Sequence, residues 1–113
     1  MQNSLIAEGC NIYGTLEFSV IFGGVTVAPN ASVEYSIVMP GARIEEGASV
    51  RYAIIGENAV IRRNARIGAR PEDMTDRTEW GIAVVGGDLT IGAGQSVAAN
   101  EMVDRDRMGA DEV

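Results

Sequence analysis

The sequence predicts an all-β domain in which short parallel strands wind into a triangular coil. Two observations carry this prediction: a unit of seventeen residues recurs along the chain, and aliphatic side chains return every five or six residues within each unit. β-Branched residues suit short strands with one buried face. An amphipathic helix would repeat its apolar positions every three or four residues, so the pattern disfavours a helix.

Each repeat unit supplies one coil of the predicted structure, and the first unit is two residues short. The five units span residues 4–18, 19–35, 36–52, 53–69 and 83–99. Residues 70–82 match no unit, so they are predicted to form an inserted loop. We therefore expect one domain over residues 1–103 and a polar tail over residues 104–113.

Three columns of aliphatic residues are predicted to form the core, one column on each side of the triangle. The first column holds Ile6, Ile21, Val38, Ile55 and Val85. The second column holds Ile12, Val27, Ile44, Ile61 and Ile91. The third column holds Leu16, Val33, Val50, Ile67 and Val97. Each full unit is therefore divided into six, six and five residues.

The predicted corners carry residue types that tolerate a positive φ, as a sharp turn requires. These residues are Gly9, Gly24, Gly41, Asn58, Asp88, Asn30, Gly47, Asn64 and Gly94. Mostly small residues follow the corners and are expected to point inward, namely Cys10, Val25, Ala42, Ala59, Ala31, Ala48 and Ala65. On the five-residue side we expect a larger inward residue, namely Leu5, Val20, Ile37, Ile54 and Val84.

Composition narrows the possible partners. The chain has nine basic residues, all of them Arg, against sixteen acidic residues, and its net charge is −7. This balance argues against nucleic acid or an anionic membrane surface as a partner. No apolar run approaches the length of a membrane span. Cys10 is the single cysteine, so no internal disulfide can form, and a cytoplasmic, reducing compartment is expected.

Two groups of side chains on the outer surface are candidate sites. The first group is an aromatic column of Phe18, Tyr35 and Tyr52, which is a candidate interface with a neighbouring subunit or domain. The second group is a set of arginines that could contact an anion or effector, namely Arg62, Arg63, Arg66, Arg70 and Arg77. Glu45 and Glu46 are predicted to lie one coil from Arg62 and Arg63. A solvated, ion-paired face is therefore the alternative interpretation of the arginines.

No catalytic constellation is visible in the sequence. There is no His, and Cys10 occupies a small inward position typical of core filling. The glycines of residues 86–94 fall on corner columns and do not form a phosphate-binding loop before a helix. We expect no catalytic residue, no cofactor-binding residue and no metal ligand in this chain.

The repeat resembles that of the hexapeptide-repeat family, and this resemblance implies a left-handed parallel β-helix of about five triangular coils with one inserted loop. The handedness rests on the resemblance alone, because the general rule for parallel crossovers favours the right-handed form. Many members are acyltransferases with a His base or zinc enzymes with His ligands. A chain without His lacks the residues for either chemistry.

A narrower resemblance follows from "NSLIAEGCNIYGTLEFSVIF", with its shortened first coil and Gly9-Cys10 pair, and from the insertion before "WGIAVVG". Over residues 3–103 the chain resembles the C-terminal β-helix of bacterial glucose-1-phosphate adenylyltransferases. That family makes ADP-glucose from ATP and glucose 1-phosphate for glycogen synthesis, with magnesium, in an N-terminal catalytic domain. ATP and magnesium would therefore belong to the parent enzyme and not to this chain.

The resemblance implies a regulatory and oligomerisation domain whose partners are a missing catalytic domain and further copies of the subunit, four in the parent enzyme. The arginines around the insertion are then the candidate effector contacts. The alternatives are the β-helix of another sugar-1-phosphate nucleotidyltransferase, a freestanding hexapeptide transferase, or a stand-alone scaffold. Only three residues precede the first coil, so we expect a preceding domain or another subunit to cover its open strand edges.

Overall fold

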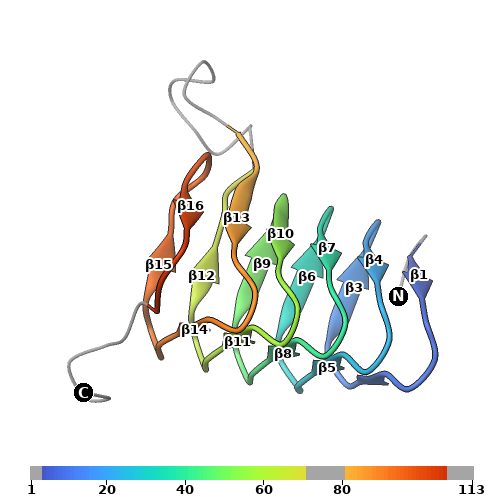
Figure 1. The fold of residues 1–113 in the computed structure, drawn as a ribbon. Coiled ribbons are helices and arrows are strands. Elements are labelled where there is room, and N and C mark those ends of the chain that lie inside the picture. The colour runs from blue at the N-terminus through green and yellow to red at the C-terminus, as the bar shows by residue number, and fades with distance from the viewer. Residues whose placement is uncertain (1–3, 71–80, 107–113) are drawn as a thin grey trace.

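The structure is a computed structural model that describes residues 4–70 and 81–106. In these residues all regular structure is β, in short strands of two or three residues (Figure 1). Sheet I contains β1 (Leu5–Ile6), β4 (Val20–Ile21), β7 (Ile37–Val38), β10 (Ala53–Ile55), β13 (Ala83–Val85) and β16 (Met102–Val103). Sheet II contains β2 (Asn11–Ile12), β5 (Thr26–Val27), β8 (Arg43–Ile44), β11 (Val60–Ile61) and β14 (Thr90–Ile91). Sheet III contains β3 (Thr15–Glu17), β6 (Ser32–Glu34), β9 (Ser49–Arg51), β12 (Arg66–Ile67) and β15 (Ser96–Val97).

Each strand pairs in parallel with the strand three places further along the chain, so three consecutive strands make one turn of a coil. The coils stack as a left-handed parallel β-helix, which confirms the predicted fold class (Figure 1). The predicted columns are the observed register. For example, Ile21 pairs with Val38, and Val38 pairs with Ile55.

The core consists of the three aliphatic columns and of the small residues that follow the corners. From the second coil onward the column residues are almost fully buried, as Val27, Val33 and Ile55 show. Ala42 and Ala48 are also fully buried, which confirms that a small side chain fills the narrow space beside each column. The interior consists of apolar side chains apart from two buried serines, Ser19 and Ser36.

The corners follow the prediction, and the structure adds a third set. All nine predicted corner residues have a positive φ, between 57° and 80°. Phe18, Tyr35 and Tyr52 also have a positive φ, between 47° and 49°, at the corner that leads from sheet III into sheet I. The sequence did not indicate this corner, because large aromatic residues rarely adopt a left-handed backbone.

One expectation about sheet I is wrong. Leu5, Val20, Ile37, Ile54 and Val84 were expected to point inward, but they form the outward row of the sheet, where Leu5 is 71% exposed. Adjacent residues of a strand point to opposite faces, so a residue next to a buried column residue points outward. The inward positions are two residues before the column, and they hold Ser19, Ser36, Ala53 and Ala83.

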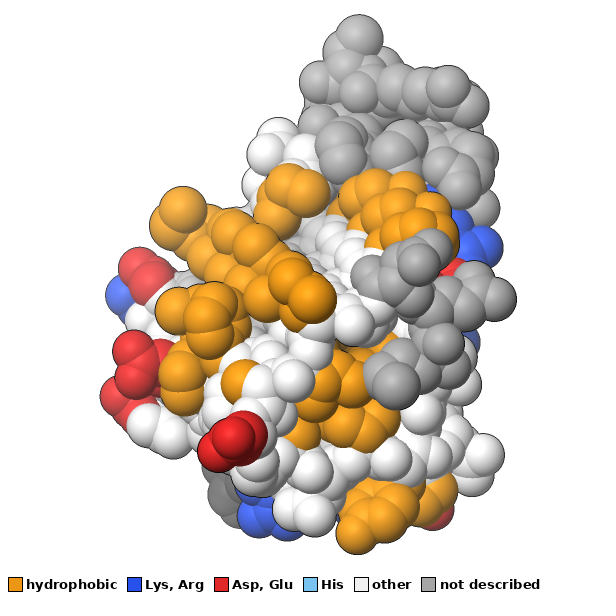
Figure 2. Space-filling view, turned by 90° about the vertical axis from the view of Figure 1, so that its right-hand side faces the viewer, with side chains coloured by type: hydrophobic (Ala, Val, Ile, Leu, Met, Phe, Trp, Pro, Cys, Tyr) orange, Lys and Arg blue, Asp and Glu red, His pale blue; other side chains and the backbone are white. Residues whose placement is uncertain are grey.

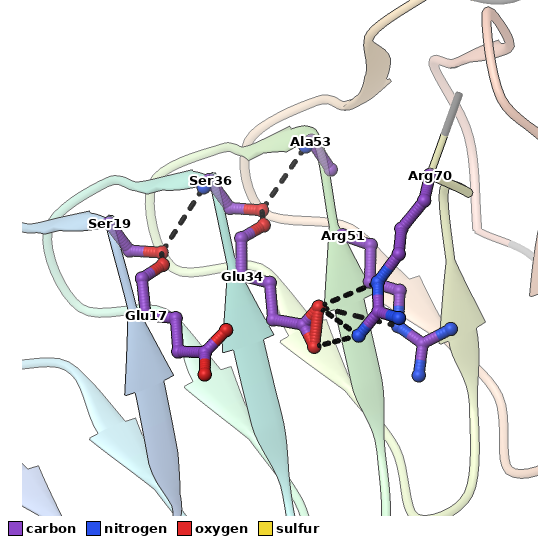
Figure 3. A network of polar contacts seen from close by, with 7 residues as sticks. All are labelled: Glu17, Ser19, Glu34, Ser36, Arg51, Ala53 and Arg70. Carbon is purple, nitrogen blue, oxygen red and sulfur yellow. Dashed lines mark hydrogen bonds and ion pairs between the residues drawn. The ribbon is translucent and has the colours of Figure 1, made fainter. Parts of the chain in front are cut away.

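Ser19 and Ser36 connect the coils at this corner through their hydroxyl groups (Figure 3). Ser36 Oγ donates to the Glu34 carbonyl at 2.7 Å and accepts from the Ala53 amide at 3.2 Å. Ser19 makes the same two bonds one coil earlier, to Glu17 and Ser36. At the aromatic corner these backbone groups do not pair with each other as they do along the strands. The buried hydroxyls bond them instead.

The two ends of the coil differ from the prediction in detail. β16 adds a strand that was not predicted as part of a coil, and it pairs with β13. At the other end, the first coil leaves Leu5, Ile6 and Tyr13 exposed, and hydrophobic side chains gather on that end of the molecule (Figure 2). The predicted insertion lies almost entirely outside the described residues.

Candidate anion-binding site

The structure divides the predicted arginine cluster between two places. Arg62 and Arg63 lie at the corner between sheets II and III, directly after β11. Arg66 lies on β12 with its side chain on the outer face of sheet III, and Arg70 follows that strand. Arg77 lies outside the described residues. Only Arg66 and Arg70 therefore remain candidates for one common site on sheet III.

Arg70 binds Glu34 of β6, two coils earlier in the chain (Figure 3). Arg70 Nε donates to Glu34 Oε2 at 3.0 Å, and Arg70 Nη2 donates to Oε1 at 2.6 Å. This forked geometry is the strong arrangement for a guanidinium and a carboxylate. Glu34 is only 8% exposed, so the pair fastens the chain beyond β12 against the outer face of sheet III.

Arg51 of β9 is the second cation beside Glu34, and sequence reasoning missed its importance. Its Nε lies 4.0 Å from Glu34 Oε2, too far for a hydrogen bond. This Nε is buried and has no hydrogen-bond partner among the described residues. Since Arg70 already occupies the carboxylate, the three side chains together carry one excess positive charge.

A hollow of about 310 Å³ lies beside this cluster, lined by Ser49, Arg51, Arg66 and Gly68. Its walls offer two guanidinium groups and one hydroxyl group, which are donors suited to phosphate or carboxylate oxygens. The signal that could have found Arg51 was its column. It stands where the two preceding coils carry Glu17 and Glu34, so the sign of the charge reverses on this face.

The other two arginines behave differently. Arg62 Nε donates to Glu45 Oε1 at 3.1 Å, which confirms the predicted ion pair. Arg63 and Glu46 form no ion pair, so that prediction is wrong. Both line a second hollow, of about 350 Å³, together with Arg43 and Glu45. Because this hollow contains charges of both signs, it favours an anion less than the hollow on sheet III does.

The aromatic column is confirmed as a continuous stack. The ring centroids of Phe18 and Tyr35 are 5.0 Å apart, and those of Tyr35 and Tyr52 are 4.9 Å apart. The ring planes differ by 15° and 7°, respectively. Stacking across coils offsets part of the strain of three left-handed backbones. A role of this stack as an interface stays a prediction.

No arrangement for acid–base or metal chemistry is visible in the part of the chain that the structure describes. There, no three His, Cys, Asp or Glu side chains are placed to hold a metal ion. Cys10 is half-buried, and its Sγ donates to the Phe22 carbonyl at 3.1 Å. Across residues 4–70 and 81–106, no helix has the length and apolar character needed to cross a membrane.

Comparison with known proteins shows which family the chain belongs to. Residues 1–85 match the family described as GlmU-like, C-terminal hexapeptide. The chain belongs to this hexapeptide family. It is also similar to glucose-1-phosphate adenylyltransferase from Desulfitobacterium hafniense, with 38% identity over 94% of this chain and 26% of that protein.

A second relative is glucose-1-phosphate adenylyltransferase from Acetivibrio thermocellus, with 34% identity over 92% of this chain and 25% of that protein. The hexapeptide chain thus spans about a quarter of the length of these relatives and matches their C-terminal part. Among solved structures, GDP-perosamine N-acetyl transferase from Caulobacter crescentus is similar over 95% of this chain and 50% of that chain. Its identity to this chain is 17% and the TM-score is 0.36, so it carries no argument about function.

Proposed function

We propose that this chain is the C-terminal regulatory and oligomerisation domain of a glucose-1-phosphate adenylyltransferase. The observation that carries the proposal is the match of almost the whole chain to the C-terminal part of proteins with that name. In the parent protein, ATP, glucose 1-phosphate and magnesium would bind to the region that precedes this domain. We also propose a cytoplasmic location, in keeping with the lone Cys10.

The regulatory part of the proposal rests on the hollow of sheet III. We infer that Arg51 and Arg66 contact a phosphate or carboxylate group of an anionic effector, while Arg70 is held by Glu34. The Arg51 side chain is 35% exposed and lines the hollow, so its guanidinium group can donate to an anion there, while its buried Nε stays beside Glu34. In a chain of net charge −7, an excess of positive charge at this place favours a specific anion site.

Titration with inorganic phosphate, followed by calorimetry and by thermal melts, tests this site. We expect saturable binding to the parent chain and a loss of affinity of about tenfold in Arg66→Gln, because one charge-assisted contact is removed. Arg66 is exposed, so this change should leave the fold intact. Arg43→Gln is the matched control, because Arg43 is the exposed outward arginine of β8 on sheet II. Equal affinity of the two variants, or no binding to the parent chain, would reject the site.

The catalytic part is tested separately. The 113-residue chain should form no ADP-glucose from ATP and glucose 1-phosphate, since no phosphate loop and no catalytic constellation is visible in its sequence. The product of the complete reading frame should form ADP-glucose in the presence of magnesium. Synthesis by the 113-residue chain that disappears in a point variant of that chain would contradict the proposal.

A further inference from the structure

Exposed hydrophobic side chains concentrate on one of the three faces of the coil. Nine large hydrophobic residues are exposed in the described part of the chain, and seven of them lie on the outer face of sheet I or on its two corners. These seven are Leu5, Phe18, Phe22, Tyr35, Ile37, Ile82 and Met102. The other two, Ile6 and Tyr13, belong to the open first coil.

The register of sheet I arranges this face into three rows that run along the coil axis. The central row holds Leu5, Val20, Ile37, Ile54, Val84 and Met102. The row on the aromatic corner holds Phe18, Tyr35, Tyr52 and Ile82. The row on the opposite corner holds Ala7, Phe22, Met39, Gly56 and Gly86. We call these three rows the apolar face.

The apolar face carries no charge over five consecutive coils, and Asp104 at its far end is the first charged residue. The outward residues of the other two sheets include Arg43 on sheet II and Glu34 and Arg66 on sheet III. This contrast matters in a chain of net charge −7, because two copies repel each other wherever carboxylates meet.

The size of the apolar face reaches that of the largest apolar patches on soluble monomers, which are often functional. From the exposed fractions of the seven side chains, which range from 38% to 75%, the uncovered area is several hundred Å². Patches of more than about 300–600 Å² usually mark an interaction site. Each partner of a stable protein interface contributes about 800 Å², so this face is close to one complete half of an interface.

We propose that the apolar face binds the apolar face of a second copy of this chain, side by side, around a two-fold axis. A two-fold contact uses the same surface on both partners, so an uncharged surface brings no like charges together. This proposal gives the partner surface for the assembly role in the proposed function, and it rests on that role.

The test is multi-angle light scattering of the 113-residue chain across a concentration series, for the parent and two variants. Ile37→Glu places a charge in the central row of the apolar face, where Ile37 is 38% exposed. Thr26→Glu places the same charge on the outward row of β5 in sheet II and serves as the control. We expect the parent and the control to reach twice 12.0 kDa, and the dimer of Ile37→Glu to be at least about tenfold weaker.

Circular dichroism melts should show that all three proteins are folded, and Ile37→Thr provides a milder change at the same position if Ile37→Glu is not. A parent that stays at 12.0 kDa at every concentration would overturn the proposal and would leave the face to a different partner. A dimer that survives Ile37→Glu but is lost in Tyr13→Glu would overturn it in favour of contact through the first coil. Phosphate binding to sheet III is measured separately, so failure of one proposal is distinguishable from failure of the other.

Discussion

Sheets I and III share the aromatic corner and the same apolar core, yet their outer faces are opposites. On sheet III, the carboxylate of Glu34 is buried beneath Arg70 and is paired with it inside the chain. On sheet I, the outward row is aliphatic and has no cover within the described residues. The packing of the coil requires apolar or small side chains at inward positions, whereas outward positions accept side chains of any kind. Changes to Glu34 or Arg70 on sheet III should therefore alter the stability of the chain, and changes on sheet I should alter its association.

The largest effect is expected for Glu34→Ala on sheet III. This change removes the forked bonds to Arg70 and leaves two guanidinium groups close together, so we expect a loss of about 2–3 kcal/mol in the free energy of unfolding. Urea denaturation measures this loss. Glu17→Ala is the control from the same column, and it should change stability by no more than about 0.5 kcal/mol. Equal losses in both variants would show that the Arg70 contact does not stabilise sheet III.

The second largest loss of stability is expected at the corner between sheets I and II. Gly41 and Gly24 both have a positive φ, but a Cβ on Gly41 would collide with Asn58 Oδ1 of the next coil, whereas one on Gly24 would meet only ordinary contacts. Gly41→Ala should therefore cost about 1–2 kcal/mol, and Gly24→Ala should cost less. Thermal melts of the two variants give the difference, and a Gly24→Ala variant that is the less stable of the two would contradict it.

A smaller loss of stability is expected at the aromatic corner, where sheet III leads into sheet I. Ser36→Ala leaves the buried Ala53 amide without its acceptor and should cost about 1 kcal/mol. Ala53→Ser should be within about 0.5 kcal/mol of the parent, because its hydroxyl can replace the bond that the Ala83 amide now makes to the Tyr52 carbonyl. Chemical denaturation measures the free energy of unfolding of both variants. A neutral Ser36→Ala would mean that the hydroxyl ladder is dispensable.

The smallest effect on stability is expected on the apolar face itself. Ile37→Thr should change the free energy of unfolding of the dilute chain by less than about 0.5 kcal/mol, since Ile37 is 38% exposed and Thr keeps the β-branched shape. Denaturation at low protein concentration measures this value. A loss comparable to that of Glu34→Ala would show that the apolar face stabilises the single chain, and the contrast between the two sheets would then fail.

The sequence by itself determined the coil, because a stacked solenoid places residues one period apart in direct contact. The period therefore predicts the register, such as Val38 beside Ile55, and the Gly, Asn and Asp columns predict the corners. It also predicted the aromatic stack, since Tyr35 and Tyr52 stand one period apart.

Only the tertiary structure decided which way the side chains of sheet I point and which charges meet on sheet III. Ile37 and Val38 are both aliphatic, so their pattern does not distinguish the inward residue from the outward one, and the corner before the strand makes that choice. Glu34 and Arg70 are thirty-six residues apart, which is not a multiple of the period, so no column pairs them. Their contact, and the unpaired nitrogen of Arg51 beside it, arise where the chain leaves the repeat and folds back over the coil.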